Sequence, residues 1–493
     1  MNILFVNPPF KAEYGKFSRE ARSPMITNSG VIYYPLWLLY AAGVCEKHGY
    51  GITILDAPAK QMKKEEAIEW IESKKLDYKL IVIDTSTPSI YSDVEFGGVL
   101  KEKFPNAYVV LVGTHPTALP KETLELDRRI DAIACGEFDY IIRDVAIAIS
   151  NNENPQNVNG LAYIDNSGNF KRNKPMELIT NLDQIPFAAE LIKKYLDPKD
   201  YFFAASDYPE IQLFTGRGCP ARCYFCVYPQ LMHGHVYRTR TAQNVVEEFE
   251  YIINELPEVK EIVIEDDTFT IDKKRTQEIC NMLIEKEINK KIKWLCNARV
   301  NLDYETMILM KKAGCKLIIP GIENGSQKML NNMKKGTTIE QIKKYVKNAR
   351  KAGLLVHACY MVGNRGETIE TMNETLKLAI ELNTDTAQFY TLHVYPGTEA
   401  YEWAKENGYI DTGDFSKWVK EDGSDNTVIH TDDMSAEELV EFCNKARKKY
   451  YLRPKYILMK VIQSINHPSE FKRNLRGFKN FAPKLFKKER KDD

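Results

Sequence analysis

Two series of short apolar segments constrain the fold of this chain more than any other feature. The first series occupies residues 1–148, where apolar runs alternate with segments of helical period. Continuous apolar strands separated by helices indicate a parallel sheet that is covered on both faces. The sequence therefore predicts an N-terminal doubly wound, Rossmann-like α/β domain, with strands near 3–6, 51–55, 80–83, 108–112 and 132–134.

The second series predicts a barrel over residues 206–415. Six apolar segments alternate with polar–apolar segments of helical period. A complete eight-repeat barrel usually takes about 250 residues, so we expect a partial (β/α)6 barrel of the TIM type. The expected strands lie near 211–214, 262–264, 293–296, 316–319, 356–361 and 388–393.

The remaining segments are expected to be a connector and an extension. Residues 149–205 are predicted to be a linker with a β-hairpin near 160–171. Residues 416–493 are predicted to be a helical C-terminal region, and from Arg447 onward the chain has 15 Lys or Arg against 4 Asp or Glu.

The aromatic–basic composition of this extension leaves two interpretations open. It indicates either an amphipathic helix that contacts an anionic membrane or a solvated closing helix. The chain as a whole has no net charge, so we expect no nucleic-acid partner. The aromatic residues concerned are Tyr450, Tyr451, Tyr456, Phe471, Phe478, Phe481 and Phe486.

Three cysteines are concentrated directly after the first expected barrel strand. Cys219, Cys223 and Cys226 have the spacing C-x3-C-x2-C, and glycines at 216 and 218 allow the backbone to approach a bulky inorganic group. Three thiolates on one loop can ligate three corners of a cubane cluster and leave the fourth iron open. The alternatives are a structural zinc site completed by His233 or His235, and cysteines buried for packing alone.

This motif, written C-x3-C-x-aromatic-C, resembles that of the radical S-adenosylmethionine (SAM) superfamily. The resemblance implies a [4Fe-4S] cluster whose open iron binds SAM, and a low-potential electron donor such as flavodoxin or ferredoxin. Reductive cleavage of SAM would give a 5′-deoxyadenosyl radical that abstracts hydrogen from an unactivated carbon.

The same resemblance implies SAM contacts at the ends of successive strands. Phe225 would contact the adenine, Glu265 and Asp266 the amino group, and Arg299 the carboxylate. Glu323 would contact the ribose or methionine, and the segment at Gly363 would support the adenine. Each residue also has an ordinary interpretation, such as acids at a helix N-terminus or a surface salt bridge. Arg365 stands where the family often has proline, which leaves that contact in doubt.

The N-terminal domain resembles the cobalamin-binding domain that precedes many radical SAM barrels. Thr85, Ser86, Gly113 and Thr114 match the positions where that family packs the nucleotide tail. The loop after the first strand, residues 7–11, has no histidine, so a histidine lower ligand from that loop is not expected. The alternative is a related fold that is kept only for packing or substrate binding.

Stretches in both domains are similar to the hopanoid-biosynthesis branch of radical SAM proteins, which forms the cyclitol ether of bacteriohopanetetrol. We expect radical chemistry, linked to cobalamin, on a lipid, saccharide or other secondary metabolite. A cobalamin-dependent C-methyltransferase is the alternative, and a non-catalytic iron–sulfur redox protein is a distant one. No catalytic acid, base or radical-quenching residue is identifiable. The N-terminus has no secretory pattern, so a cytoplasmic location is expected.

Overall fold

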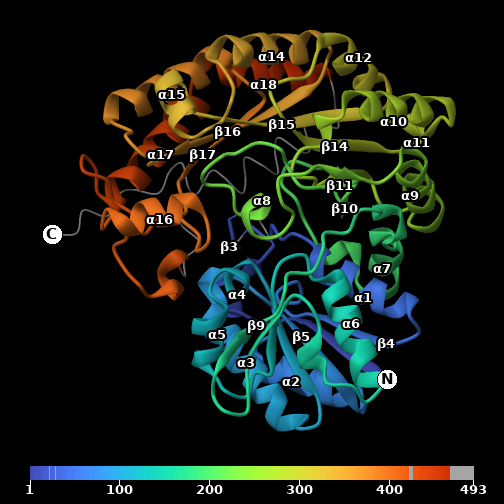
Figure 1. Ribbon diagram of the computed structural model, residues 1–493. Coiled ribbons are helices and arrows are strands. Elements are labelled where there is room, and N and C mark those ends of the chain that lie inside the picture. The colour runs from blue at the N-terminus through green and yellow to red at the C-terminus, as the bar shows by residue number, and fades with distance from the viewer. Residues whose placement is uncertain (21–22, 28, 421–425, 467–493) are drawn as a thin grey trace.

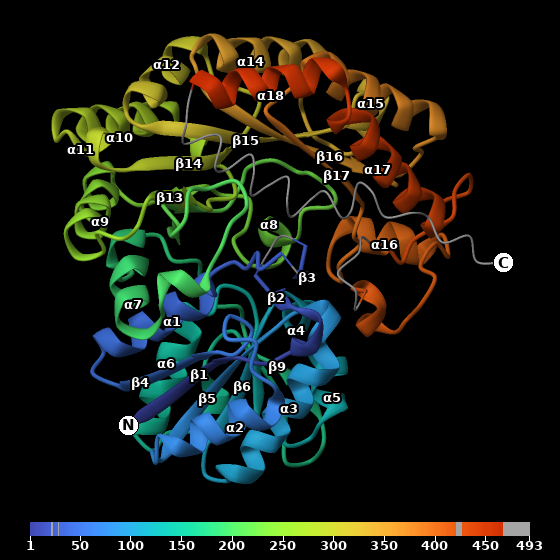
Figure 2. The same ribbon diagram turned by 180° about the vertical axis from the view of Figure 1, so that it is seen from behind.

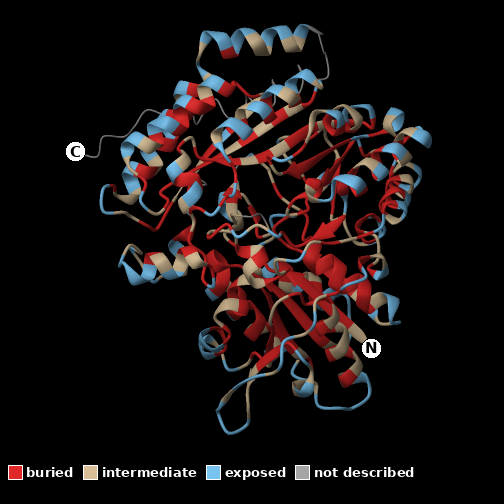
Figure 3. Ribbon diagram, turned by 45° about the horizontal axis from the view of Figure 1, so that its top comes forward, coloured by how far each residue is buried: buried red, intermediate tan, exposed pale blue. Residues whose placement is uncertain are grey.

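The structure, a computed structural model, describes residues 1–20, 23–27, 29–420 and 426–466. Figure 1 shows two α/β lobes, with the N-terminal lobe below and the barrel lobe above. The strands are the most deeply buried parts of both lobes, and the outer faces of the helices are exposed (Figure 3).

The N-terminal sheet has the expected parallel, doubly wound core. Its parallel strands run in the order β4 (Gly51–Asp56), β1 (Asn2–Asn7), β5 (Tyr78–Thr85), β6 (Tyr108–Gly113) and β7 (Ala132–Ala134). All five predicted strands are confirmed. The strand order reverses at β1, and ligands bind at the carboxyl edge of such a switch point.

The two faces of this sheet bury alternate residues. Phe5 and Val82 pack with α1 (Leu36–Lys47) and α6 (Asp139–Ser150), whereas Val6 and Ile83 pack on the other face with α2 (Lys64–Ser73) and α3 (Ile90–Lys103). A period of two along each strand places successive side chains on opposite faces. Because both faces of the sheet are covered, successive residues of its central strands are apolar, as the sequence pattern indicated.

The segment 149–205 contributes more than a linker. Its hairpin, β8 (Leu161–Ile164) and β9 (Phe170–Arg172), adds antiparallel to β7 and extends the N-terminal sheet to seven strands. The hairpin was expected, but its place in the sheet was not. The rest of the segment contains the short helix α7 (Ala188–Tyr195), which packs against α1.

The barrel lobe contains the six parallel strands that the sequence predicts, in chain order. They are β10 (Glu210–Leu213), β13 (Glu261–Ile264), β14 (Lys293–Ala298), β15 (Cys315–Glu323), β16 (Leu355–Val362) and β17 (Thr386–Thr391).

The longer helices that alternate with these strands lie on the outer face of the sheet (Figure 2). The residue before each helix is Thr or Asp, and its side chain accepts a backbone N–H of the first turn, which explains why the helices begin there. The helices are α9 (Ala242–Glu255), α10 (Lys273–Glu285), α12 (Tyr304–Lys312), α14 (Ile339–Lys351) and α15 (Ile369–Leu382).

The C-terminal helices close the open edge of the barrel sheet. In α17 (Ala436–Tyr451), the Tyr451 hydroxyl accepts from the Ala387 amide at 2.9 Å and donates to the Ala387 carbonyl at 2.7 Å, so it occupies the edge of β17. Capping an edge strand in this way prevents pairing with another chain. The last described helix is α18 (Pro454–Asn466).

Three tyrosines of the proposed membrane-contacting series are turned into the protein. Tyr450 and Tyr456 are buried, and Tyr451 pairs with Ala387. These three do not form an outward aromatic surface, which corrects that part of the prediction. Phe471, Phe478, Phe481 and Phe486 lie outside the described residues. Within the described chain, no helix combines the length and hydropathy that a membrane crossing requires.

Candidate functional site

The cysteine loop begins after β10 and β11 (Gly216–Arg217) and ends at α8 (Val227–Leu231), for which Cys226 is the N-cap. Gly218 has φ +89°, and a Cβ there would lie 2.2 Å from the Val236 carbonyl oxygen. Only glycine fits this position. The His235 ring contacts the carbonyls of Ala221 at 2.9 Å and Cys219 at 3.2 Å, so the loop is fixed from within.

The thiols lie in a partly closed environment, with two cations close to them. Cys219 is 8% exposed and Cys223 is 7% exposed. Burial raises the pKa of the Cys219 thiol, and the charge of Arg299 opposes this effect. Lys335 interacts electrostatically with Cys223. Nearby cations favour thiolates, which are the form that ligates iron.

The residues present fit a cubane cluster better than a single zinc ion. His233 Nδ1 bonds Asp267 at 2.9 Å, and its ring packs against Trp37 and Tyr228. No three His, Cys, Asp or Glu side chains of the described residues converge as ligands of one metal ion. A cubane binds one thiolate at each iron, so its three cysteines need not converge.

Glu323, a predicted SAM residue, is held at the end of β15 from two sides. Lys335 Nζ lies 2.7 Å from its Oε1, and the Tyr390 hydroxyl donates to Oε2 at 3.0 Å. Its backbone has φ +67°, a strained value for a residue with a side chain, and such strain is concentrated at functional sites. The sequence analysis missed Lys335; the pair Lys334-Lys335 was its only signal.

Arg299 lies beside the Lys335–Glu323 ion pair. Its Nη2 donates to the Lys335 carbonyl at 2.7 Å. The structure thus brings together Arg299, Glu323 and two of the cysteines. The order of these residues in the chain did not indicate that Lys335 is a partner of both Arg299 and Glu323.

The acidic segment after β13 divides into two environments. Glu265 accepts from Asn297 Nδ2 at 3.2 Å and lines a narrow pocket with Asp267, Trp37 and Tyr228. Asp266 instead is fully buried and accepts from the amide and hydroxyl of Thr215, both at 2.6 Å. The structure therefore places Asp267, rather than Asp266, next to Glu265 at the pocket.

The predicted adenine segment is tied directly to the cysteine loop. The Tyr224 hydroxyl donates to Asn364 Oδ1 and accepts from the Arg365 amide, both at 3.2 Å. Gly363 precedes these residues with φ +88°. Phe225 packs edge-on against Tyr224, with 6.0 Å between ring centroids.

The predicted cobalamin residues meet at one edge of the N-terminal sheet. Thr85 and Gly113 are paired where β5 and β6 end, and the Thr85 hydroxyl donates to the Val112 carbonyl at 2.7 Å. A Cβ at Gly113 would lie 2.3 Å from the Thr85 carbonyl oxygen. Ser86 Oγ is 2.8 Å from Ser89 Oγ, and Thr114 begins α4 (Thr114–Ala118).

A group of buried carboxyls at the same edge was not predicted. Burial raises the pKa of Asp56 to about 6, of Asp84 to about 7 and of Asp93 to about 6. Arg19 is their cationic partner, with Nη2 2.7 Å from Asp93. Asp84 Oδ2 has no hydrogen-bond partner within the described part of the chain. An unused buried acceptor beside small residues fits a polar, amide-rich ligand such as cobalamin.

His115 lies at this edge, and its ring is held by two neighbours. Its Nδ1 lies 3.2 Å from Thr87 Oγ1, and its ring packs edge-on against Phe415. Burial lowers its pKa to about 3, so the ring is neutral.

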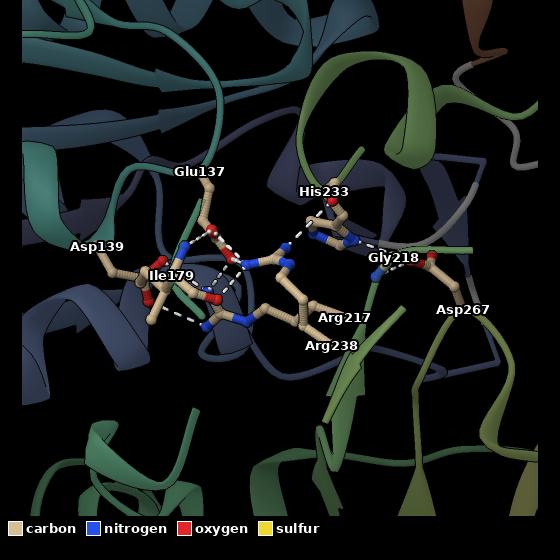
Figure 4. A network of polar contacts seen from close by, with 8 residues as sticks. All are labelled: Glu137, Asp139, Ile179, Arg217, Gly218, His233, Arg238 and Asp267. Carbon is tan, nitrogen blue, oxygen red and sulfur yellow. Dashed lines mark hydrogen bonds and ion pairs between the residues drawn. The ribbon is translucent and has the colours of Figure 1, made fainter. Parts of the chain in front are cut away.

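A buried ionic network joins the two lobes next to the cysteine loop (Figure 4). Arg217, two residues before Cys219, contacts Glu137 and Asp139 at 2.8 Å each. Arg238 contacts Glu137 at 2.8 Å and donates to the Ile179 carbonyl at 2.6 Å. The acids belong to the N-terminal lobe and the arginines to the barrel lobe.

A second branch of polar contacts leads from this region to the loop itself. The Gly218 amide donates to Asp267 Oδ2 at 3.0 Å, and Asp267 also bonds His233. In addition, α8 packs against α4, so the helix after Cys226 touches the helix that starts at Thr114. The predicted cluster loop and the predicted cobalamin edge therefore face one another.

Comparison with known proteins gives two family matches. The B12 binding domain model matches residues 22–146, and the Radical SAM superfamily model matches residues 213–379.

Curated relatives match almost the whole chain. A Pyrococcus horikoshii protein described as an uncharacterized methyltransferase is 30% identical over 479 residues, which are 97% of this chain and 98% of that protein. The anaerobic magnesium-protoporphyrin IX monomethyl ester cyclase of Rubrivivax gelatinosus is 25% identical over 93% of this chain and 78% of its own length.

A solved structure shares the two-lobe fold. It is the radical SAM methyltransferase TsrM of Kitasatospora setae with cobalamin and a [4Fe-4S] cluster bound. The TM-score is 0.65 at 17% identity, covering 92% of this chain and 89% of that one.

Proposed function

Because the chain belongs to the radical SAM superfamily and carries a B12-binding domain, we propose that it transfers a methyl group from SAM, through cobalamin, to an unactivated carbon of a small molecule. The cofactors of this enzyme are a [4Fe-4S] cluster, SAM and cobalamin. When bound, they supply a carbon-centred radical and a methyl carrier.

The protein's own residues bind and orient these groups. Cys219, Cys223 and Cys226 would hold three irons, and the cations Arg299 and Lys335 would offset the negative charge of the cluster. Glu265 is suited to the amino group of SAM and Arg299 to its carboxylate.

The observation that carries the proposal is the packing of α4 on α8 together with the Arg217–Glu137 contact. Methyl transfer requires the carrier and the radical source to reach the same carbon, and small displacements in such a geometry are costly. The buried ion pair between the lobes would hold the carrier and the radical source at a fixed distance from each other.

A second candidate is ring closure or another bond-forming reaction without net methylation. It is supported by the cyclase relative, which matches 93% of this chain. The hopanoid branch remains a hypothesis about the substrate, which is a small molecule or a lipid, and the electron donor is proposed to be a flavodoxin or ferredoxin.

Product analysis separates the two candidates. The anaerobic, reconstituted protein would be incubated with dithionite, SAM, cobalamin and a metabolite extract from a deletion strain. Methyl transfer predicts S-adenosylhomocysteine together with a product that is heavier by one methylene unit. Formation of 5′-deoxyadenosine with no S-adenosylhomocysteine would reject methylation and support ring closure.

A further inference from the structure

The last described helix, α18, exposes an aliphatic face. Ile457, Leu458, Val461, Ile462 and Ile465 are between 49% and 72% exposed. At 3.6 residues per turn these positions lie on one side of the helix. Five of the twelve large apolar side chains exposed among the described residues belong to this one face. Single exposed apolar residues are ordinary, but a cluster marks an interaction site.

The opposite side of α18 is fastened to the barrel by polar contacts. The Tyr456 hydroxyl donates to the Asp385 carbonyl at 2.7 Å, and Gln463 Nε2 donates to Asp385 Oδ1 at 2.6 Å. Lys460 Nζ lies 3.7 Å from the same carboxylate. The inward side of the helix thus combines these polar groups with Tyr456 and Met459, which pack on the core, and its aliphatic residues face outward. An ordinary surface helix buries its aliphatic face instead. In Figure 2 it lies on the outside of the barrel lobe, away from the N-terminal lobe.

The size of the face and the charge that follows it favour a membrane over a second copy of the chain. A helix of this length is about 20 Å long, so the face covers much less than the roughly 800 Å² per partner of a stable protein interface. Residues 467–493, which continue the chain, contain nine Lys or Arg against four Asp or Glu. Stable anchoring to a bilayer takes two signals, such as an apolar insertion and a basic segment.

We infer that α18 docks the protein on an anionic lipid surface, with its aliphatic face in the interfacial layer. This surface is separate from the cofactor sites, and the inference does not depend on the proposed reaction. It also replaces the buried tyrosines as the apolar component of the contact.

The test is flotation of the full-length protein with vesicles of phosphatidylcholine, with and without phosphatidylglycerol. We expect the protein to float with the anionic vesicles and to be released by high salt. Leu458→Glu should lower the vesicle partition coefficient about tenfold. Leu452→Glu is the matched control, since Leu452 is 44% exposed but lies off this face, and it should bind as the wild type does.

Three results would overturn the inference. Leu458→Glu could float as well as the wild type. Sedimentation could show a dimer that this substitution dissociates, which would assign the face to a second copy of the chain. Truncation after Asn466 could increase flotation, which would mean that the C-terminal segment itself covers the face.

Discussion

Gly113 is a residue at which one missing side chain decides whether a cofactor site can form. Its φ of +121° and its closeness to the Thr85 carbonyl leave no room for a Cβ. A Cβ at Gly113 would therefore clash with Thr85 at the ends of β5 and β6, where cobalamin is expected to bind.

Gly113→Ala should weaken hydroxocobalamin binding about tenfold, since strain of this kind costs about 1–3 kcal/mol. An anaerobic absorbance titration measures it. Gly168→Ala is the control, because Gly168 also has a positive φ, +83°, but no atom lies within 4 Å of the position that an added methyl group would occupy. Equal affinity in Gly113→Ala and the wild type would remove this edge from the cobalamin site.

The buried carboxyls of Asp56, Asp84 and Asp93 also affect the protein as individual residues, through their raised pKa values. Their pKa values, about 6 to about 7, exceed the unfolded value, so the folded protein favours their protonated forms. The stability that they contribute at acid pH is lost as the pH rises through this range.

The cofactor-free protein should lose stability as the pH rises from about 5 to about 8. Asp84→Asn should make this loss smaller by about 1 kcal/mol or more. Thermal unfolding at several pH values measures this. Asp127→Asn serves for comparison, because hydrogen bonding to Arg129 lowers the pKa of Asp127 and moves its titration below the window. If the pH dependence of stability is the same in Asp84→Asn and the wild type, the pKa of Asp84 is not raised as stated.

At the scale of elements, the turn after β7 and the short strand β11 act as one joint between the lobes. Glu137 receives both Arg217 and Arg238, and all three side chains are almost fully buried. Removing one partner of a buried ion pair leaves the other charge without compensation.

Glu137→Gln should destabilise the protein by about 3 kcal/mol. It should also reduce SAM cleavage, because the joint lies two residues from Cys219. Calorimetry and 5′-deoxyadenosine release measure the two effects. Glu95→Gln removes an exposed partner of Lys64 and should cost about 0.5 kcal/mol or less. Similar effects of the two substitutions would show that the joint is an ordinary surface pair.

The same elements show where sequence reasoning succeeds and where it stops. The strands of both sheets and the capped helices were predictable, because apolar runs and Thr or Asp caps are local signals. The Arg217–Glu137 pair joins residues 80 positions apart, so no local pattern indicates it. Lys335 beside Glu323 and the carboxyls beside Arg19 were missed for the same reason. The aromatic–basic pattern left two interpretations open and did not indicate that Tyr450 and Tyr451 of α17 are turned inward.

For the whole molecule, the face-to-face placement of the two edges where cofactors are expected matters more than either edge alone. The N-terminal sheet and the barrel each have their expected sites at the carboxyl ends of parallel strands, as such sheets do. The contact between α4 and α8 turns these two edges toward each other. Under the proposed function, one buried joint and one helix pair would therefore border the space in which the substrate reacts.

The central claim is an open iron site on Cys219, Cys223 and Cys226 that cleaves SAM. The most direct measurement is 5′-deoxyadenosine release from the anaerobically reconstituted protein with dithionite and SAM. We predict release by the wild type and by the control Cys135→Ala, and none by Cys223→Ala, which should also lose cluster iron. Release that persists in Cys223→Ala, or a wild type that holds no iron and sulfide, would contradict the account.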